Sequence, residues 1–119
     1  MAEQDDTTLV QYVVVRKDLK WPAGALIAQA CHATTAAIWA HRDHVDTIAY
    51  CTNADDMHKI VLSAESASSL DDLASALSNA GVGHRRWIEQ PENIVTCVAS
   101  RPASRALLQP FFKAFRLLR

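Results

Sequence analysis

Blocks of apolar and polar residues follow one another along the chain, and their spacing predicts alternating strands and helices. Residues 9–15 form a nearly continuous, β-branched apolar run, which is typical of a strand buried on both faces. An alanine-rich block over residues 23–41 follows Trp21-Pro22, and because proline is favoured where helices begin, this block predicts a long helix. Over residues 66–80, apolar side chains recur at the three- and four-residue spacing of one helix face, and they stop at Gly81. That segment predicts an amphipathic helix with a signal at each end.

The shorter blocks complete an α/β order. A short helix is expected over residues 43–51, and a final helix is expected from Pro102 to Phe115, which Pro110 should end or kink. Three further strands are expected, at residues 59–63, 84–88 and 94–99. Because strands and helices alternate, this order predicts a largely parallel sheet with right-handed crossovers and one late antiparallel strand.

Length and composition restrict the class of protein. The chain has 119 residues, so we expect one domain over residues 9–119, preceded by a flexible acidic N-terminus, residues 1–8. That N-terminus resembles neither a secretory signal nor an arginine-rich transit peptide, and no apolar run approaches the ~20 residues that cross a bilayer. The expected location is therefore the cytoplasm, with no membrane partner. Cys31, Cys51 and Cys97 have no paired spacing and are interpreted as small buried hydrophobic residues.

Charge is unevenly distributed although the net charge is only −1. A last stretch without any acidic residue carries five basic ones: Arg101, Arg105, Lys113, Arg116 and Arg119. A second basic cluster, Arg16, Lys17 and Lys20, follows the first predicted strand. Such clusters can bind phosphate groups on a near-neutral protein, and the alternative is an ordinary solvated surface.

Polar residues near the start of the long helix are the first candidate for chemistry. The sequence holds no glycine-rich phosphate loop of the dinucleotide or Walker type, so a nucleotide cradle is not expected. Gln29 and His32 share a helix stripe that is otherwise lined by alanine, and their polar groups are costly to bury without partners. A helix N-terminus adds backbone donors for an anion. The alternative is that both side chains are structural hydrogen-bonding groups beneath a neighbouring loop.

The loop over residues 87–94 is the second candidate. It places two carboxylates and two amides between two predicted strands, with a proline in the turn. Ordinary hairpin chemistry would explain the same composition. If the loop is functional, Glu89 should line the same cleft as Gln29 and His32, because a helix that starts at the end of the first strand lies beside the loop that leaves the third.

Several of these segments together resemble a known family. The quoted segments are Val10-Gln11-Tyr12-Val13-Val14-Val15-Arg16-Lys17-Asp18-Leu19-Lys20, Ala28-Gln29-Ala30-Cys31-His32-Ala33, Trp87-Ile88-Glu89-Gln90-Pro91-Glu92-Asn93-Ile94 and the closing Phe115-Arg116-Leu117. They resemble the archaeal and eukaryotic type of peptidyl-tRNA hydrolase, in its divergent peptidyl-tRNA hydrolase domain-containing branch, over essentially the whole chain. The resemblance implies a three-layer α/β/α fold with a four-stranded mixed, mostly parallel sheet. It also implies hydrolysis of the ester between a peptide and tRNA, with peptidyl-tRNA as partner and neither a cofactor nor a metal.

The resemblance suggests roles for individual residues. Gln29, His32 and Glu89 would orient or activate water, Lys20 would supply charge, and Asn93 would supply a hydrogen bond. The basic residues expected to contact substrate are Arg16, Lys17, Arg101 and Arg105. A homodimer is left open.

One departure from the family pattern concerns catalysis itself. The main family opens its helix with Gly-Lys-Gly-Lys, whereas this sequence has Pro22-Ala23-Gly24-Ala25. The family's later Asp and Thr correspond to Glu89 and Asn93. Losing a cation that stabilises transition-state charge typically costs about 10²–10³ in rate. A catalytically weak or silent module that binds tRNA or a protein is therefore the alternative to an active hydrolase.

Overall fold

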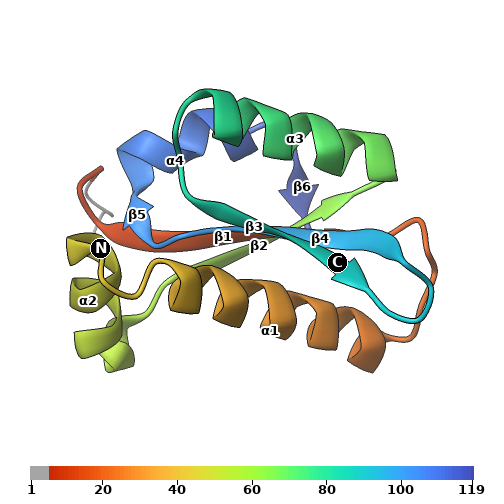
Figure 1. Cartoon of the computed structure of the whole chain (residues 1–119), viewed down its shortest axis with the longest axis horizontal. Helices are drawn as coiled ribbons and strands as arrows, with labels where there is room; N and C mark the ends of the chain where they lie inside the picture. Colours follow the sequence, from red (N-terminus) through yellow and green to blue (C-terminus); the bar gives the residue numbers. More distant parts are fainter. Residues whose placement is uncertain (1–5) are drawn as a thin grey trace.

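A six-stranded mixed sheet with helices on both faces organises the chain (Figure 1). The structure is a computed structural model that describes residues 6–119, so most of the acidic segment predicted over residues 1–8 lies outside the described residues. In chain order the elements are β1 (Leu9–Arg16), α1 (Ala23–Ala40), α2 (Val45–Thr52), a 3-10 turn (Ala54–Asp56), β2 (Lys59–Ala64), α3 (Ala67–Asn79), β3 (His84–Glu89), β4 (Ile94–Ser100), β5 (Ala103–Ser104), α4 (Arg105–Phe112) and β6 (Arg116–Leu117).

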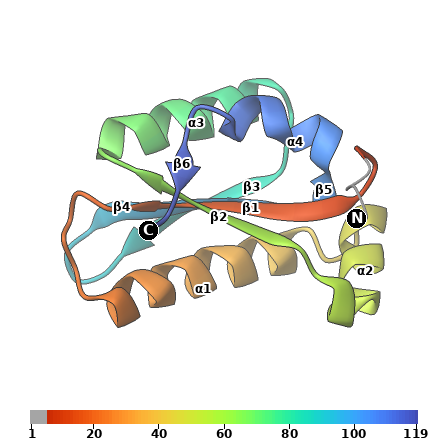
Figure 2. The same cartoon turned by 180° about the vertical axis from the view of Figure 1, so that it is seen from behind.

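The strand order corrects two expectations about the sheet. The order is β3-β4-β1-β2-β6, with β5 also paired to β1, so the expected count of four strands is wrong. β1, β2 and β3 run in one direction as expected, but the antiparallel β4 lies between β3 and β1. As a result only β1 and β2 form a parallel pair, and the sheet is mixed rather than mostly parallel. The added strands, β5 and β6, are two residues long and come from the C-terminal segment, where β6 pairs with β2 (Figure 2).

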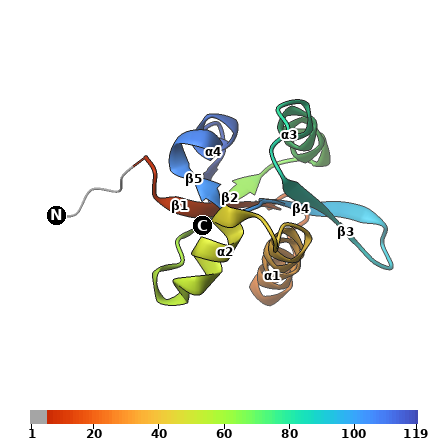
Figure 3. The same ribbon diagram turned by 60° about the vertical axis from the view of Figure 1, so that its left-hand side comes forward.

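Helices α1 and α2 cover one face of the sheet, and α3 and α4 cover the other (Figure 3). The run over residues 10–15 is buried on both faces, which confirms the prediction for the first strand. Val10, Tyr12 and Val14 belong to the cluster beneath α3 and α4, where the Tyr12 ring stacks on Phe112 at 4.5 Å between centroids. The opposite side of β1 packs against the alanines of α1 in a second cluster. Because alanine is small, α1 lies close to the sheet.

A buried glutamine fixes α1 against the sheet. Gln11 is fully buried on the α1 side of β1, and its Nε2 donates to the carbonyls of Thr34 at 3.1 Å and Ser100 at 3.0 Å. Lys59 Nζ donates to Gln11 Oε1 from β2. The amide therefore joins four elements, and its polar atoms are all paired as a buried group requires.

The end of α3 agrees with the sequence prediction, whereas the start of α4 differs from it. Gly81 has φ +71°, and the N–H groups of Gly81 and Val82 donate to the carbonyls of Ser78 and Leu77, which closes α3 as the glycine signal predicted. The final helix begins at Arg105 instead of Pro102, because β5 pairs with the start of β1 first. Ser104 then caps α4 by accepting from the backbone N–H of Leu107. Pro110 lies inside this helix, which continues to Phe112.

The three cysteines differ in their surroundings. Cys97 is buried in β4, and burial raises the pKa of its thiol. Cys51 on α2 is only partly buried, and Cys31 on α1 is exposed, so interpreting Cys31 as a buried hydrophobe is wrong. Over residues 6–119, no helix is long and apolar enough to cross a membrane.

Candidate active site

Gln29 and Glu89 meet at the edge of the sheet where β1 and β3 end. Gln29 lies on α1 and is only 2% exposed, and Glu89 is the last residue of β3. Gln29 Nε2 donates to Glu89 Oε2 at 3.0 Å, although 60 residues separate them in the chain. The structure thus brings together two residues that the topology argument placed beside each other.

Thr96 determines how the Gln29 amide points. Thr96 is fully buried on β4, and its Oγ1 donates to Gln29 Oε1 at 2.7 Å. Since the amide oxygen accepts from this hydroxyl, the amide nitrogen must face Glu89. Thr96, Gln29 and Glu89 therefore form a chain of hydrogen bonds from the core to the surface.

Trp87 holds the other oxygen of the Glu89 carboxylate. Side chains alternate between faces along a strand, so Trp87 and Glu89 both point toward α1. Trp87 Nε1 donates to Glu89 Oε1 at 3.1 Å, and the indole stacks on the His32 ring, with centroids 4.8 Å apart and planes 15° apart. Each carboxylate oxygen accordingly accepts one N–H, and His32 is joined to the site through Trp87.

These contacts favour the ionised form of Glu89. The hydrogen bond from Trp87 lowers the pKa of the Glu89 carboxyl, and the hydrogen bond from Gln29 and the nearby His32 lower it further. The carboxylate is therefore an anion at neutral pH, fixed in orientation. Because each oxygen can accept more than one hydrogen bond, the carboxylate can also accept a hydrogen bond from a bound water molecule.

The turn between β1 and α1 carries the nearest basic residues. Arg16 makes a two-point ion pair with Asp18, at 2.7 Å and 3.1 Å, and also donates to the carbonyl of Val95. This pairing lowers the pKa of Asp18 and raises that of Arg16. Lys17 and Lys20 are exposed, and within residues 6–119 their side chains have no hydrogen bond or ion pair. Two free cations thus lie in the turn that leads into α1.

Comparison with known proteins assigns the family. Residues 9–118 match the family described as peptidyl-tRNA hydrolase PTH2. The chain belongs to the PTH2 peptidyl-tRNA hydrolase family. The human protein named "Putative peptidyl-tRNA hydrolase PTRHD1" is 49% identical, over 93% of this chain and 83% of its own length. The mouse protein of the same name is 48% identical over the same shares. The resemblance inferred from the sequence motifs is therefore confirmed.

Other residues that the PTH2 resemblance pointed to lie outside the Gln29–Glu89 contact. Asn93 has φ +58° and closes the β3–β4 turn: its N–H donates to the Glu89 carbonyl at 2.8 Å, and its Oδ1 accepts from Gln90. Arg101 and Arg105 lie at the opposite end of the sheet, where Arg101 pairs with Asp46 at 3.2 Å. That end is separated from Glu89 by the seven residues of β4, or roughly 24 Å.

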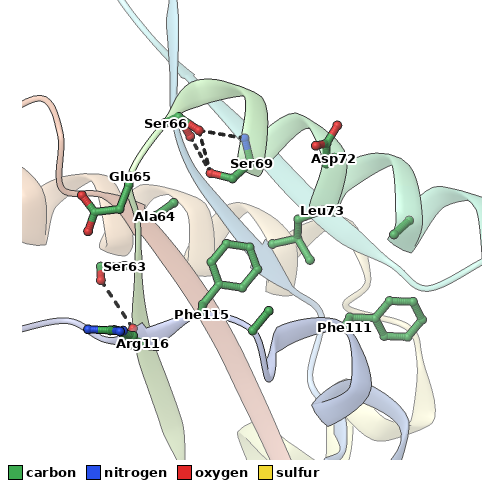
Figure 4. Close-up of a pocket in the computed structure, with 12 residues that line it drawn as sticks. Ser63, Ala64, Glu65, Ser66, Ser69, Asp72, Leu73, Phe111, Phe115 and Arg116 are labelled. Atoms are coloured by element: carbon green, nitrogen blue, oxygen red, sulfur yellow. Dashed lines mark hydrogen bonds between the residues drawn. The ribbon is translucent and has the colours of Figure 1, made fainter.

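A larger hollow of this PTH2 member lies away from Glu89. It measures about 800 Å³ and lies among the end of β2, α3 and the C-terminal segment (Figure 4). Leu73, Phe111 and Phe115 give it an apolar floor. Of the described residues predicted for the site, none lines this hollow, so volume alone does not locate the chemistry. Residues 6–119 also contain no group of three His, Cys, Asp or Glu side chains that could hold a metal ion.

Sequence analysis missed two members of the hydrogen-bonded site. Thr96 is a hydroxyl in the middle of the mostly apolar core strand β4, and Trp87 lies two residues before Glu89 on the same face of β3. Both signals were present in the pattern. Their partners could not be named, because pairing with Gln29 and Glu89 depends on the strand order.

Proposed function

We propose that this protein hydrolyses the ester bond between a peptide and tRNA, with Glu89 holding the attacking water. Membership of the PTH2 family supports the substrate, and the carboxylate held between Trp87 and Gln29 supports the role of Glu89. That carboxylate carries the proposal, because ester hydrolysis needs an oriented water and a group that accepts its proton. Residues 9–119 would act as one catalytic domain.

The reaction would proceed by attack of water on the ester carbonyl. Glu89 accepts a proton as the water oxygen bonds to the carbonyl carbon. It returns that proton to the ribose oxygen as the carbon–oxygen bond to the ribose breaks, and the peptide acid then ionises in water. The products are a free peptide carboxylate and tRNA with a restored ribose hydroxyl, so no cofactor is required. Lys20 and the first backbone N–H groups of α1 would stabilise charge on the carbonyl oxygen, and Asn93 would supply a further hydrogen bond.

The same arrangement gives His32 a supporting part. Its ring stacks on Trp87, so it would orient the indole that donates to Glu89 and add positive charge beside the carboxylate when protonated. Arg16 is tied to Asp18 and would shape the turn, leaving Lys17 and Lys20 to contact phosphate. Arg101 and Arg105, at the opposite end of the sheet, would contact a more distant part of the tRNA.

The test is hydrolysis of peptidyl-tRNA by matched variants. Glu89→Gln keeps the shape of the side chain but removes its charge and its ability to accept a proton, so kcat should fall by about 10²–10⁴. Glu92→Gln is the control, because Glu92 is an exposed carboxylate in the same hairpin. Equal rates for wild type and Glu89→Gln would contradict the assignment.

The silent-module alternative has one observation in its favour. The first turn of α1 carries Ala23 and Ala25 where the family resemblance places lysines, so no cation of that turn faces the site. The double substitution Ala23→Lys, Ala25→Lys separates the two functions. If the wild-type protein already releases peptide and the double variant releases it only modestly faster, the hydrolase function is supported. Release that is absent in wild type and appears only in the double variant supports the silent module.

A further inference from the structure

A second, smaller hollow lies beside the proposed catalytic carboxylate on the exposed side of α1. It measures about 410 Å³ and is lined by Cys31, His32, Thr35, Ala36, Trp39 and Trp87. Its volume falls within the ~300–1,000 Å³ of small-ligand pockets. Aromatic rings from two elements form its walls, because Trp39 lies on α1 and Trp87 on β3.

Of the two indoles, Trp39 is exposed and Trp87 is partly buried, and both are accompanied by positive charge. Trp39 is 67% exposed, so much of its indole is open to a ligand. The Arg42 guanidinium lies 4.4 Å from the centre of the Trp39 ring, and that of Arg85 lies 5.7 Å from the centre of Trp87. No acidic side chain lines the hollow. Exposed aromatic rings flanked by arginines are the combination that proteins use to stack the bases of single-stranded nucleic acid.

Trp87 links this hollow to the reacting bond. One edge of its indole donates to Glu89, and its ring forms part of the hollow and stacks on His32. In peptidyl-tRNA the ester is carried by the ribose of the 3′-terminal adenosine. If that ribose faces Glu89, the attached base lies within one nucleoside of it, and Trp87, which contacts Glu89, is the nearest wall of the hollow.

We propose that the hollow between Trp39 and Trp87 binds the 3′-terminal adenine base of the tRNA by stacking. The inference rests on the proposed function for the identity of the nucleic acid, and on the aromatic lining and flanking arginines for the binding mode. It assigns Trp39 and Trp87 as the residues that recognise the end of the substrate. Stacking of the base would place the ester against the carboxylate that Gln29 and Trp87 hold.

The experiment compares two RNAs that differ only in the terminal base. Fluorescence anisotropy is measured with a 5′-labelled single-stranded RNA ending in CCA and with a matched RNA whose last nucleotide has no base. Wild type should bind the complete RNA on the order of tenfold more tightly, since that is the usual contribution of one stacked base. Trp39→Ala should bind both RNAs equally, and Trp39→Phe should restore the preference. Ile48→Ala is the control: Ile48 is 52% exposed on α2, outside the hollow, and the preference should stay unchanged.

The outcomes separate this inference from the proposed function. If the wild-type protein hydrolyses peptidyl-tRNA but binds both RNAs equally, or binds neither, the stacking site is wrong and the proposed hydrolase function is unaffected. A clear preference for the complete RNA without any hydrolysis overturns the enzymatic proposal and leaves the stacking site. A preference that survives in Trp39→Ala, with folding verified by circular dichroism, also overturns the stacking site.

Discussion

Glu89 accepts one N–H group on each of its carboxylate oxygens, and this shapes its response to pH. The bond from Trp87 is the largest influence that holds its pKa below the ordinary 4.5, followed by that from Gln29. Because the pKa is lowered in the folded state, the ionised carboxylate stabilises the fold above the unfolded-state pKa. That contribution is lost as the pH falls through the folded-state value.

A titration of Glu89 by carbon-detected NMR checks this account. The wild-type carboxyl should titrate below pH 4.5, and Trp87→Phe, which removes the indole donor, should move the midpoint upward. Hydrolysis should follow the same shift, with activity retained from neutral pH down to the Glu89 midpoint. Glu92 serves as an internal reference, because Trp87→Phe leaves its surroundings intact. An unchanged Glu89 midpoint in Trp87→Phe would contradict the hydrogen-bond assignment.

Individual site residues could be predicted from the sequence where topology determined their position. Gln29 and Glu89 were expected in one cleft because α1 and the β3–β4 hairpin both start at the ends of strands that run the same way. The role of Asn93 in the turn could not be separated from a role in catalysis, since an asparagine suits both. Thr96 and Trp87 escaped because a hydroxyl or an indole in a strand identifies no partner until the neighbouring strands are known.

At the scale of elements, the junction of α1 with β3 depends on a close approach. A Cβ added to Gly83 would come within 2.4 Å of the His41 ring, which is held at the end of α1 by its Nδ1 donating to the Ala37 carbonyl at 2.9 Å. Any residue larger than glycine at position 83 would have to displace this ring. This contact sets the distance between the end of α1 and the start of the strand that carries Trp87 and Glu89.

A double-mutant cycle tests the contact. Gly83→Ala should lower the free energy of unfolding by about 1–3 kcal/mol, because the ring must be displaced from a packed position. In a His41→Ala background the same substitution should cost markedly less, since the obstructing ring is gone. Urea denaturation of the four proteins gives the coupling. A cost for Gly83→Ala that is the same in both backgrounds would show that the ring is not the obstacle.

The elements with strong patterns were predicted with small errors at their ends, and the weak ones were missed. The apolar run of β1, the alanine-rich α1 and the glycine-terminated α3 each carry a local signal that agrees with their final packing. β5 and β6 are two residues long, too short for any periodicity, and exist because the C-terminal segment pairs with strands that are distant in sequence. The place of β4 between β3 and β1 is likewise a property of the whole sheet.

At the scale of the whole molecule, the basic residues are divided between the two ends of the sheet. Within residues 6–119, Lys17 and Lys20 have no ion pair at the end that carries Glu89, whereas Arg101 at the other end pairs with Asp46. Phosphate contacts release counterions, so each lysine that contacts tRNA should contribute about one to the slope of log affinity against log salt. Substituting the lysines at the Glu89 end of the sheet should therefore lower the affinity for tRNA.

Charge reversal tests whether tRNA contacts the lysines of the β1–α1 turn. Lys17→Glu and Lys20→Glu should each weaken tRNA binding and lower the salt slope by about one, as measured by filter binding at several salt concentrations. Lys113→Glu is the matched control, because Lys113 is an exposed lysine that follows α4 on the opposite face of the sheet (Figure 3). A larger loss in Lys113→Glu than in Lys20→Glu would place the tRNA on the wrong face for the proposed site.

The central position of β1 has a consequence for biosynthesis. This strand leaves the ribosome before its partners, because its antiparallel partners lie in residues 94–104 and the backbone N–H of Tyr12 meets its acceptor on Ser100, 88 residues later. The sheet cannot close until residues 94–104 have been made, and contacts over such separations form slowly. Throughout that interval the nascent protein exposes a valine-rich, β-prone segment that is apt to aggregate. Molecular chaperones that shield extended apolar segments should therefore govern the yield of this protein in the cell more than its final stability does.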